Sequence, residues 1–409
     1  MFNVCTLSPS VVVIPMKNML KSKHCCLFNS CYCVESLYGR RIIGFLFSRS
    51  SDAIMNVKFK FSLLIIFALV NRKVTVAESA DVISCKDENG NSVDWFYAYK
   101  LPATYNSNDR SNRGLSFLYI TATSADLKTW SLSDKTIDDP ESLIGKTLLQ
   151  SYVQKDRAVV AYNDEPPTGK AIGSDGHTKG VVVADENSGF WLIHSVPLYP
   201  NYIGKYSYPE SGRTYGQSFL CISVNSSQVD VIGKQLIYNE PDIYLNITSD
   251  FSSLYPFLHS AVTGKRIEKP PFWNDVVIKS SGGTEFRSFA KNRRFRKELY
   301  EDWVAQVLNT NLYVETWRHG TGIIPSDCPF PKKSVWNISA IKMEQLNFDF
   351  NSTKDHSKWA VSAEPSWICV GDINRAEHQK IRGGGTVCQQ SIVSEAYAAL
   401  IKSTEPCAP

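Results

Sequence analysis

The sequence predicts a mixed α/β (α+β) fold built from two similar halves. A His-x-Lys motif occurs twice, as His177 and Lys179 in one half of the chain and as His356 and Lys358 in the other. Each motif is followed by two apolar runs separated by a turn-like segment, a pattern typical of a strand–turn–strand hairpin. A segment with helical spacing comes after each hairpin. We interpret this parallel as a diverged internal duplication, with two mixed sheets flanked by helices and related by a pseudo-twofold axis.

The expected elements occupy matching places in the two halves. The hairpins are expected over 180–196 and 359–370, and the helical segments over 226–236 and 389–402. We place the first half at 78–250 and the second half at 251–409.

The repeated residue types indicate phosphodiester chemistry. In an extended strand, side chains at i and i+2 point to the same face, so each motif presents an imidazole beside an ammonium. An imidazole can attack phosphorus or move a proton, and an ammonium can hold a phosphate oxygen. The alternative for either motif alone is a histidine satisfied in the core or at the surface. The matching hairpins favour a paired site at the axis, with His177, Lys179, His356 and Lys358 as its catalytic residues.

Folding each hairpin about its turn predicts the neighbours of the two histidines. The end of the second hairpin places Asp372 and Asn374 near His356, and the equivalent offset in the first hairpin falls at His194 and Ser195. A carboxylate near an imidazole would orient it and stabilise the imidazolium. Asp372, Asn374 and His194 are therefore supporting candidates.

The beginning of the chain differs from the rest. Met55 is a second plausible start, followed by two lysines and an apolar run at 61–70 that is too short to span a bilayer. We expect a signal peptide over 55–77 and an upstream extension of unclear role over 1–54, with an internal signal-anchor as the alternative.

Removing this segment reverses the sign of the net charge. The first 77 residues carry ten Lys or Arg and two Asp or Glu, a net +8, and the whole chain is +4, so the mature part is −4. Such a protein should not attract DNA strongly at pH 7. Its six histidines gain charge on acidification while some carboxylates lose theirs, so its affinity for a polyanion rises. This behaviour favours an acidic compartment.

Cysteines and sequons indicate the secretory pathway. Five of the eleven cysteines precede the predicted signal peptide, and the six that remain are consistent with three disulfides of open pairing. None of the six has C-x-x-C spacing, so no zinc site is expected. Four N-x-S/T sequons are candidate glycosylation sites: Asn225, Asn246, Asn337 and Asn351.

The mature chain resembles the deoxyribonuclease II family, a divergent branch of the phospholipase D superfamily. The resemblance runs from about Ile83 to Cys407. It is carried by the segments 93–96, 99–102, 176–180, 189–197, 215–217, 351–353, 355–359, 369–372, 374–375 and 382–386.

The resemblance implies two phospholipase D-like halves that share one active site. It also implies cleavage of DNA at acidic pH with no metal and no cofactor, leaving 3′-phosphate and 5′-hydroxyl ends. In the superfamily mechanism one histidine forms a phosphohistidine and the other protonates the leaving oxygen, while Lys179 and Lys358 stabilise the transition state. The family further suggests three disulfides: Cys85–Cys221, Cys369–Cys388 and Cys328–Cys407.

Two places depart from the family pattern. Ala360 stands where a further, unpaired cysteine is expected. The superfamily also has an Asp after each motif lysine. Asp185 lies one residue beyond that spacing from Lys179, and no acidic residue lies at the corresponding distance from Lys358. We favour a hairpin-turn role for Asp185.

Two further segments are open to two interpretations each. The basic run at 291–297, which contains Phe295, would track a DNA backbone or form a solvated face. The Arg-Gly-Gly-Gly segment at 382–385 would present backbone N–H groups to a phosphate, or close the tight loop between two cysteines. It lacks the Lys-Ser/Thr of a P-loop, so nucleotide binding is not expected.

The leading hypothesis is a lysosomal or secreted acid endonuclease that degrades DNA from dead or engulfed cells or from food. DNA is its expected substrate, no stable membrane anchor is expected, and a homodimer is one open oligomeric state. One alternative is a catalytically silent family member that binds DNA or a protein. Another is a phosphodiesterase acting on a substrate such as a phospholipid. The presence of both histidines and both lysines argues against loss of activity, but the sequence does not say which histidine is the nucleophile.

Overall fold

A computed structural model describes residues 2–7, 10–15, 34–37, 40–43, 82–105, 113–169 and 173–407. The chain divides into two units, Met1–Glu78 and Ser79–Pro409. In the first unit, β1 (Phe2–Leu7) pairs with β2 (Ser10–Pro15), and β3 (Val34–Leu37) pairs with β4 (Arg40–Ile43). These strands fall within the predicted extension 1–54, whose role stays a prediction. The signal peptide predicted at 55–77 lies outside the described residues.

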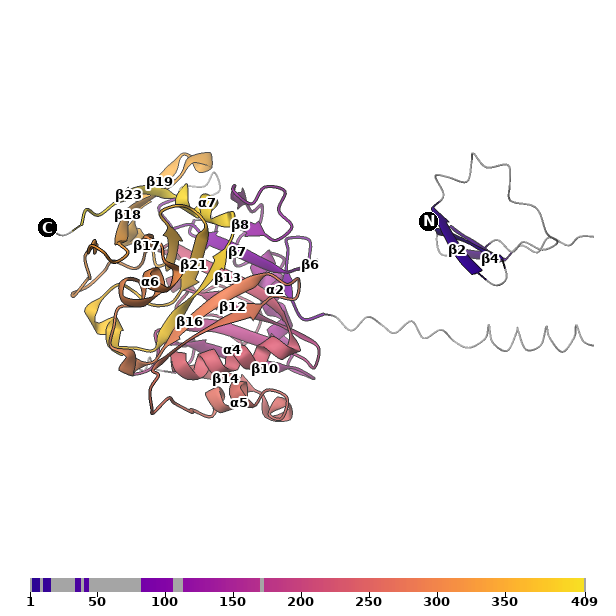
Figure 1. Cartoon of the computed structure of the whole chain (residues 1–409), viewed down its shortest axis with the longest axis horizontal. Helices are drawn as coiled ribbons and strands as arrows, with labels where there is room; N and C mark the ends of the chain where they lie inside the picture. The colour runs from indigo at the N-terminus through magenta and orange to yellow at the C-terminus, as the bar shows by residue number, and fades with distance from the viewer. Residues whose placement is uncertain are drawn as a thin grey trace, which may run out of the picture. The chain divides into compact units, whose positions relative to one another are not determined.

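The second unit is mixed α/β, as the sequence predicts, and contains two large sheets (Figure 1). The first sheet has the strand order β14 (Ile243–Ile247), β10 (Ala158–Asn163), β11 (Lys179–Ala184), β12 (Ser188–His194), β13 (Gln217–Asn225), β7 (Trp95–Lys100), β8 (Phe117–Thr121) and β9 (Ser131–Leu132). A short ladder, β5 (Cys85–Lys86) with β6 (Ser92–Val93), precedes it in the chain.

The second sheet is built from residues further along the chain, coloured orange to yellow in Figure 1. Its strand order is β15 (Trp273–Lys279), β16 (Glu285–Lys291), β22 (Gly384–Gln390), β21 (Trp367–Gly371), β20 (Trp359–Ser362), β17 (Leu312–Glu315), β18 (Val335–Met343) and β19 (Phe348–Asn351). One more strand, β23 (Ile401–Thr404), pairs with β18.

The central strands of the two sheets follow the same order. The hairpins predicted after the two His-x-Lys motifs are confirmed as β11–β12 and β20–β21. Each hairpin pairs with a third strand, β13 or β22, and that strand pairs on its other side with a strand of an earlier hairpin, β7 or β16. This order is compatible with an internal duplication, and the pseudo-twofold relation itself stays a prediction.

Successive side chains of a strand point to opposite faces of its sheet, so they pack into different hydrophobic clusters. In β7, Trp95, Tyr97 and Tyr99 belong to a cluster that also contains apolar residues of the second sheet, whereas Phe96 and Ala98 belong to a cluster on the other face. A third cluster lies on the far face of the second sheet. The two sheets therefore bury one common core, and their strand ends can contribute to one site.

Few helices occur in the described part of the second unit. The α-helices are α2 (Leu143–Tyr152), α3 (Glu210–Arg213), α4 (Ser226–Asn239), α5 (Pro256–Val262), α6 (Ala305–Leu308) and α7 (Val393–Ala398). The 3₁₀ segments are Ser249–Phe251, Arg293–Phe295, Glu344–Leu346, Ser352–Lys354 and Glu377–Ile381, and a π-helical segment spans Tyr300–Val304. Helix α4 packs against strands of both sheets. Within the described ranges, no helix has the length and apolar character needed to cross a bilayer.

One helical prediction is confirmed and the other is partly wrong. The helix expected over 226–236 is α4, whereas only the middle of the segment 389–402 is helical, as α7. Gln389 and Gln390 continue β22 because they pair with β16 and β21. Residues from Ile401 onward pair with β18. Sheet pairing thus overrides the local helical spacing at both ends.

The covalent features of the unit follow the predicted chemistry with one exception. The structure contains the disulfides Cys85–Cys221, Cys328–Cys407 and Cys369–Cys388, the pairing that the family resemblance implies. Of the four sequon asparagines, Asn225, Asn246 and Asn351 are exposed. Asn337 is 2% exposed, and its amide donates to the carbonyl of Ile324 and to Glu405. The folded protein therefore has no room for a glycan at Asn337, and we correct that expectation.

Candidate active site

The two His-x-Lys motifs lie where the halves touch. The backbone N–H of His356 donates to the carbonyl of Gly216 in the first half, at 2.9 Å. The N–H of His177 donates to the carbonyl of Gly383 in the second half, also at 2.9 Å. A Cβ on Gly216 would lie 2.4 Å from a carboxylate oxygen of Asp355, so this crossing requires glycine. Backbone contacts between the halves therefore bring the motifs together.

Each motif histidine is oriented by a residue of the opposite half. The Nδ1 atom of His177 lies 2.8 Å from Oε1 of Gln379, and Nδ1 of His356 lies 2.8 Å from the carbonyl oxygen of Ser195. Nζ of Lys358 also lies 3.4 Å from Nδ1 of His356, but the carbonyl oxygen of Ser195 is closer and can only accept. We therefore assign the hydrogen of each neutral ring to Nδ1. The Nε2 lone pair of each imidazole is thereby left for chemistry.

A buried carboxylate lies beside the first motif. Asp164 forms an ion pair with Lys179, and its Oδ2 lies 3.2 Å from Nη2 of Arg382 and 3.7 Å from Nε2 of His177. Burial opposes the ionisation of Asp164, but the charges of Lys179, His177 and Arg382 outweigh it and lower the pKa of Asp164. The carboxylate therefore stays charged and attracts a proton to His177.

The two histidines differ in their electrostatic surroundings. Burial lowers the pKa of His177 well below its ordinary value. Asp164 opposes this shift, whereas Lys179, Lys358 and Arg382 add to it. Burial also lowers the pKa of His356, and there the charged neighbours Lys358, Lys179 and His177 all add to the lowering. A proton shared between the two rings is thus better stabilised on His177.

Lys358 and Asp372 complete the charged part of the site. Burial, and then the charge of Lys179, lowers the pKa of Lys358 to about 7. Burial raises the pKa of Asp372 to about 8, against the attraction of Lys179. Because Lys358 gains a proton and Asp372 keeps one as the pH falls, acidification makes the site more positive and favours an anionic substrate.

The supporting residues predicted from the hairpins take unexpected places. Asp372 accepts a long hydrogen bond, 3.5 Å, from the backbone N–H of Lys179, and Ser195 rather than Asp372 bonds His356. His194 is buried in the core, where its ring lies against those of Tyr199 and Phe219.

Asn374 and Asp185 are two more positions singled out from the sequence. Asn374 is buried, and its side-chain oxygen has no hydrogen-bond partner in the described ranges. Asp185 accepts from the backbone N–H groups of Asn187 and Ser188 at 2.8 Å, which is a turn role. The carboxylate that lies beside Lys179 and His177 is therefore Asp164, and not the residue at the position that the superfamily spacing indicates.

The basic run at 291–297 contacts the segment that carries Gln379 and Arg382. Lys291 is fully buried, and its ammonium donates to the carbonyls of Gln379, at 2.9 Å, and Arg382, at 2.5 Å. Arg293 pairs with Glu240. These contacts hold the segment that carries Gln379 and Arg382. DNA contact by the exposed members of the run stays a prediction.

Sequence reasoning missed Asp164 and Gln379. Asp164 directly follows β10, whose last residue, Asn163, is paired in register with Lys179. The sequence does show an apolar run that ends in the carboxylate of Asp164. Only the register between β10 and β11, however, places that carboxylate beside Lys179. Gln379 is 202 residues from His177, and no local pattern points to it.

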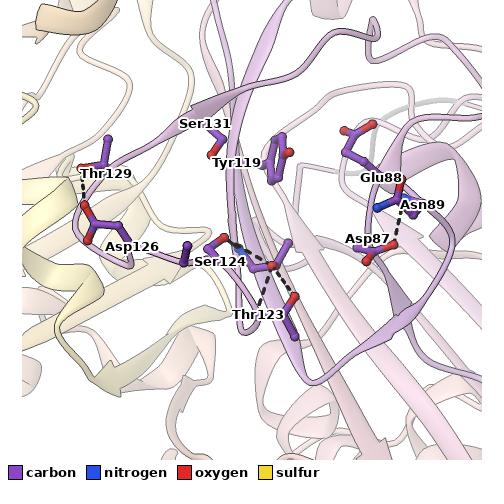
Figure 2. A pocket seen from close by; sticks show the side chains of 11 residues that line it. Asp87, Glu88, Asn89, Tyr119, Thr123, Ser124, Asp126, Thr129 and Ser131 are labelled. Carbon is purple, nitrogen blue, oxygen red and sulfur yellow. Dashed lines mark hydrogen bonds between the residues drawn. The ribbon is translucent and has the colours of Figure 1, made fainter.

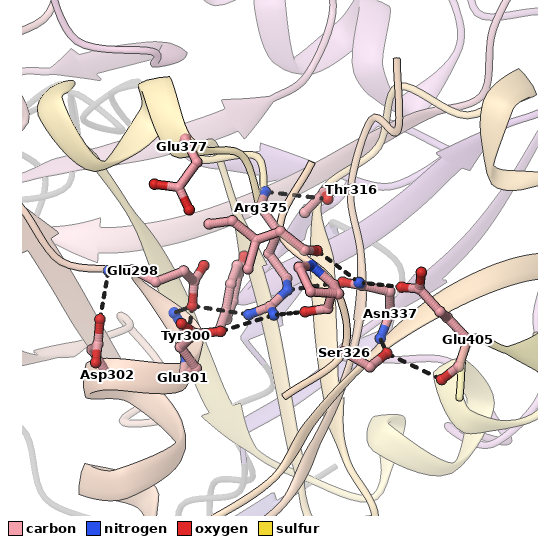
Figure 3. Close-up of polar contacts among 12 residues, drawn as sticks. Glu298, Tyr300, Glu301, Asp302, Thr316, Ser326, Asn337, Arg375, Glu377 and Glu405 are labelled. Carbon is pink, nitrogen blue, oxygen red and sulfur yellow. Dashed lines mark hydrogen bonds and ion pairs between the residues drawn. The ribbon is translucent and has the colours of Figure 1, made fainter. Parts of the chain in front are cut away.

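A polar cavity and a buried ion-pair network lie apart from the two His-x-Lys motifs. A cavity of about 450 Å³ is lined by acidic and hydroxyl side chains that include Asp87, Glu88 and Asp126, and by none of the catalytic candidates (Figure 2). Arg375 lies in a buried network with Glu298 and Glu301, shown in Figure 3. Within the described ranges, no group of three or more His, Cys, Asp or Glu side chains is arranged to hold a metal ion.

Comparison with known proteins shows the family to which the chain belongs. The family model for Deoxyribonuclease II matches residues 84–407. Deoxyribonuclease-2-alpha of Rattus norvegicus is 39% identical over 338 residues, which cover 80% of this chain and 95% of that protein. Deoxyribonuclease-2 of Caenorhabditis elegans is 36% identical over 359 residues, with 80% and 94% covered. Plancitoxin-1 of Acanthaster planci is 34% identical over 348 residues, with 83% and 97% covered. The chain therefore belongs to the deoxyribonuclease II family of enzymes.

Proposed function

We propose that the protein is an acid endodeoxyribonuclease that hydrolyses DNA without a metal, leaving 3′-phosphate and 5′-hydroxyl ends. The observation that carries this proposal is the convergence of two His-x-Lys motifs from opposite halves, each with its imidazole fixed in the Nδ1–H tautomer. Two lysines and two imidazoles supply charge stabilisation, a nucleophile and a proton donor, which together suffice for phosphodiester hydrolysis.

His356 is the proposed nucleophile. Its side chain is half-buried. Within the described ranges its Nε2 has no hydrogen-bond partner, and this atom is accessible to solvent. Burial, and then the neighbouring ammonium groups, lower the pKa of His356, so it stays neutral in acid, when an ordinary histidine would be protonated. Attack of this Nε2 on phosphorus forms a phosphohistidine attached to the 3′ side of the cut and breaks the bond from phosphorus to O5′.

His177 is the proposed general acid. It is buried, and its Nε2 lies 3.7 Å from the carboxylate of Asp164, which favours the imidazolium. His177 gives its proton to the departing O5′, which leaves as a 5′-hydroxyl. The neutral ring then takes a proton from the water that attacks the phosphohistidine, so His177 is protonated again and the 3′-phosphate is released.

The lowered pKa values of His177 and Lys358 predict higher activity at acidic pH. The pKa of His177 lies below its ordinary value, so its proton-donating form accumulates only as the pH falls. Lys358, with a pKa of about 7, is charged below that pH and loses its charge above it. Both changes favour binding and cleavage of a phosphodiester at acidic pH.

The direct test is plasmid cleavage in EDTA by the purified mature protein. We expect nicking at roughly pH 5 and little at about pH 7.5, because the proton donor and the Lys358 charge are both lost on that rise. His356→Asn should be inactive at both pH values. Cleavage that appears only after addition of a divalent cation would contradict the proposal. Retained DNA affinity without turnover in the wild type would favour the alternative, a catalytically silent DNA-binding member.

Asp164→Asn is expected to lower kcat by about 10²-fold and to move the pH–activity profile toward lower pH. The reason is that Asp164 raises the pKa of His177, so without it more acid is needed to form the proton donor. The profile is measured by initial rates across acidic pH. Asp185→Asn, which changes a turn carboxylate of the same chemistry, should leave the profile unchanged. An unshifted profile in Asp164→Asn would remove Asp164 from this role.

The proposed setting is the lysosome or the extracellular space, reached through the secretory pathway, where the enzyme degrades DNA of dead or engulfed cells or of food. Three disulfides and three exposed sequons support this setting. A homodimer stays open.

A further inference from the structure

Three aromatic rings gather beside His356. The ring of Trp317, in the segment after β17, has its centroid 4.6 Å from that of His356, in a T-shaped arrangement. Tyr215, which precedes β13 in the first half, contacts Trp317 at 4.4 Å, also T-shaped. His319 lies 4.6 Å from Trp317. We call Tyr215, Trp317 and His319 the aromatic cluster.

The aromatic cluster reaches the surface. Tyr215 and Trp317 are half-buried, and His319 is exposed. Within the described ranges, the hydroxyl of Tyr215 and the indole N–H of Trp317 make no hydrogen bond. Neither group is buried. Buried Tyr and Trp side chains usually place these groups on a partner. Both polar groups therefore face solvent.

Hydrogen bonds fix the aromatic cluster relative to the catalytic motif. Nε2 of His319 donates to the carbonyl of Thr353, three residues before His356, at 2.9 Å. The carbonyl of Tyr215 accepts from the buried ammonium of Lys100. These hydrogen bonds anchor His319 and the backbone of Tyr215 beside the motif that carries His356.

The aromatic cluster lies where a nucleobase next to the bound phosphodiester would lie. A phosphodiester bound at His356 carries a sugar on each side, and the base on one of those sugars comes within reach of the adjacent Trp317 ring. Aromatic side chains stack on every base, so such contacts need no particular sequence. Inside a duplex both faces of a base are already covered, so stacking on the protein requires a base that has left its neighbours.

We propose that the aromatic cluster binds one unstacked nucleobase next to the scissile phosphate and thereby positions that phosphate on His356. The proposal rests on the function proposed above and adds a substrate requirement to it. Cleavage at a given phosphate then depends on the base beside it, although not on which base it is.

The test is a single-stranded oligonucleotide with one internal abasic residue, labelled at one end and cleaved in EDTA at roughly pH 5. We expect the wild type to cut one phosphate next to the abasic residue about tenfold more slowly than the same phosphate in an unmodified strand, because one stacked base is missing. Phosphates far from the lesion should be cut equally in both strands.

Variants separate stacking from packing. Trp317→Ala should cut the unmodified strand about tenfold more slowly and lose the local decrease at the abasic residue, because no stacking partner remains. Trp317→Phe should keep the local decrease. Phe257→Ala is the control, since Phe257 is an exposed aromatic residue of α5 that lies outside the cluster. It should behave like the wild type.

Two results would overturn the proposal while leaving the enzyme active. One is even cutting around the abasic residue by the wild type. The other is a slow Trp317→Ala enzyme that keeps the local decrease, because its defect would then come from packing against His356. Failure of the wild type to cut any strand in EDTA would instead contradict the proposed function and this inference together.

Discussion

His177→Asn is expected to lose cleavage of ordinary DNA by about 10³-fold and to recover most of it on DNA whose scissile 5′-oxygen is replaced by sulfur. A thiol has a pKa of about 8.5, far below that of an alcohol, so a thiolate departs without a proton donor. His356→Asn should stay inactive on both substrates, because a better leaving group does not replace a nucleophile. The measurement is the single-turnover rate on an oligonucleotide with one 5′-bridging sulfur.

The control is His259→Asn, which changes a histidine of α5 outside the site and should cut both substrates like the wild type. Rescue of His356→Asn in place of His177→Asn would exchange the two roles. Rescue of neither variant would show that neither imidazole protonates the leaving group. The assignment thus depends on the position of Asp164 beside His177, because both histidines have otherwise similar tautomers.

Arg375→Ala is expected to lower the free energy of unfolding by about 3–5 kcal/mol near neutral pH. The Arg375 side chain is 1% exposed, and its two terminal nitrogens lie 3.0 Å from Glu298 and 2.9 Å from Glu301 (Figure 3). It also donates to Asn337 at 2.8 Å. Truncation leaves two carboxylates without their cation in a buried environment. Urea denaturation followed by fluorescence measures the loss.

The same variant should be less impaired in acid. Burial, and then Glu298, already raises the pKa of Glu301, and removal of the arginine raises it further. A carboxyl group with a raised pKa in the folded state contributes stability that is present at low pH and lost as the pH rises through that pKa. The deficit at about pH 4.5 should therefore be smaller than at about pH 7. A deficit that is equal at both pH values would contradict this account.

Two variants test the reason for this loss. Arg375→Lys, which keeps the charge but not the two-pronged contact, should recover part of the stability. Arg287→Ala removes a partly exposed partner of Asp275 and should cost less than about 1 kcal/mol. Arg375 also precedes the segment that carries Gln379, so its loss should slow catalysis as well.

The sequence by itself determined the family and most of the local elements, and it named the candidate site residues. The repeated His-x-Lys spacing and the period of two in the flanking runs depend only on neighbouring residues, so both hairpins and all four catalytic candidates could be named before the fold was known. Where pairing partners are distant, local spacing was a poor guide. The helical period at 389–402 yields to strands at both ends, and the sequon at Asn337 lies in the core.

Only the tertiary structure decided how the site is assembled. Folding each hairpin about its turn predicts Ser195 near His177 and Asp372 near His356. The halves face each other, however, so Ser195 bonds His356 and Asp372 lies at Lys179. Asp164 and Gln379 reach His177 through strand register and through contact between the halves. Spacing along a strand fixes which side chains share a face, whereas the packing of one sheet against another fixes what that face meets.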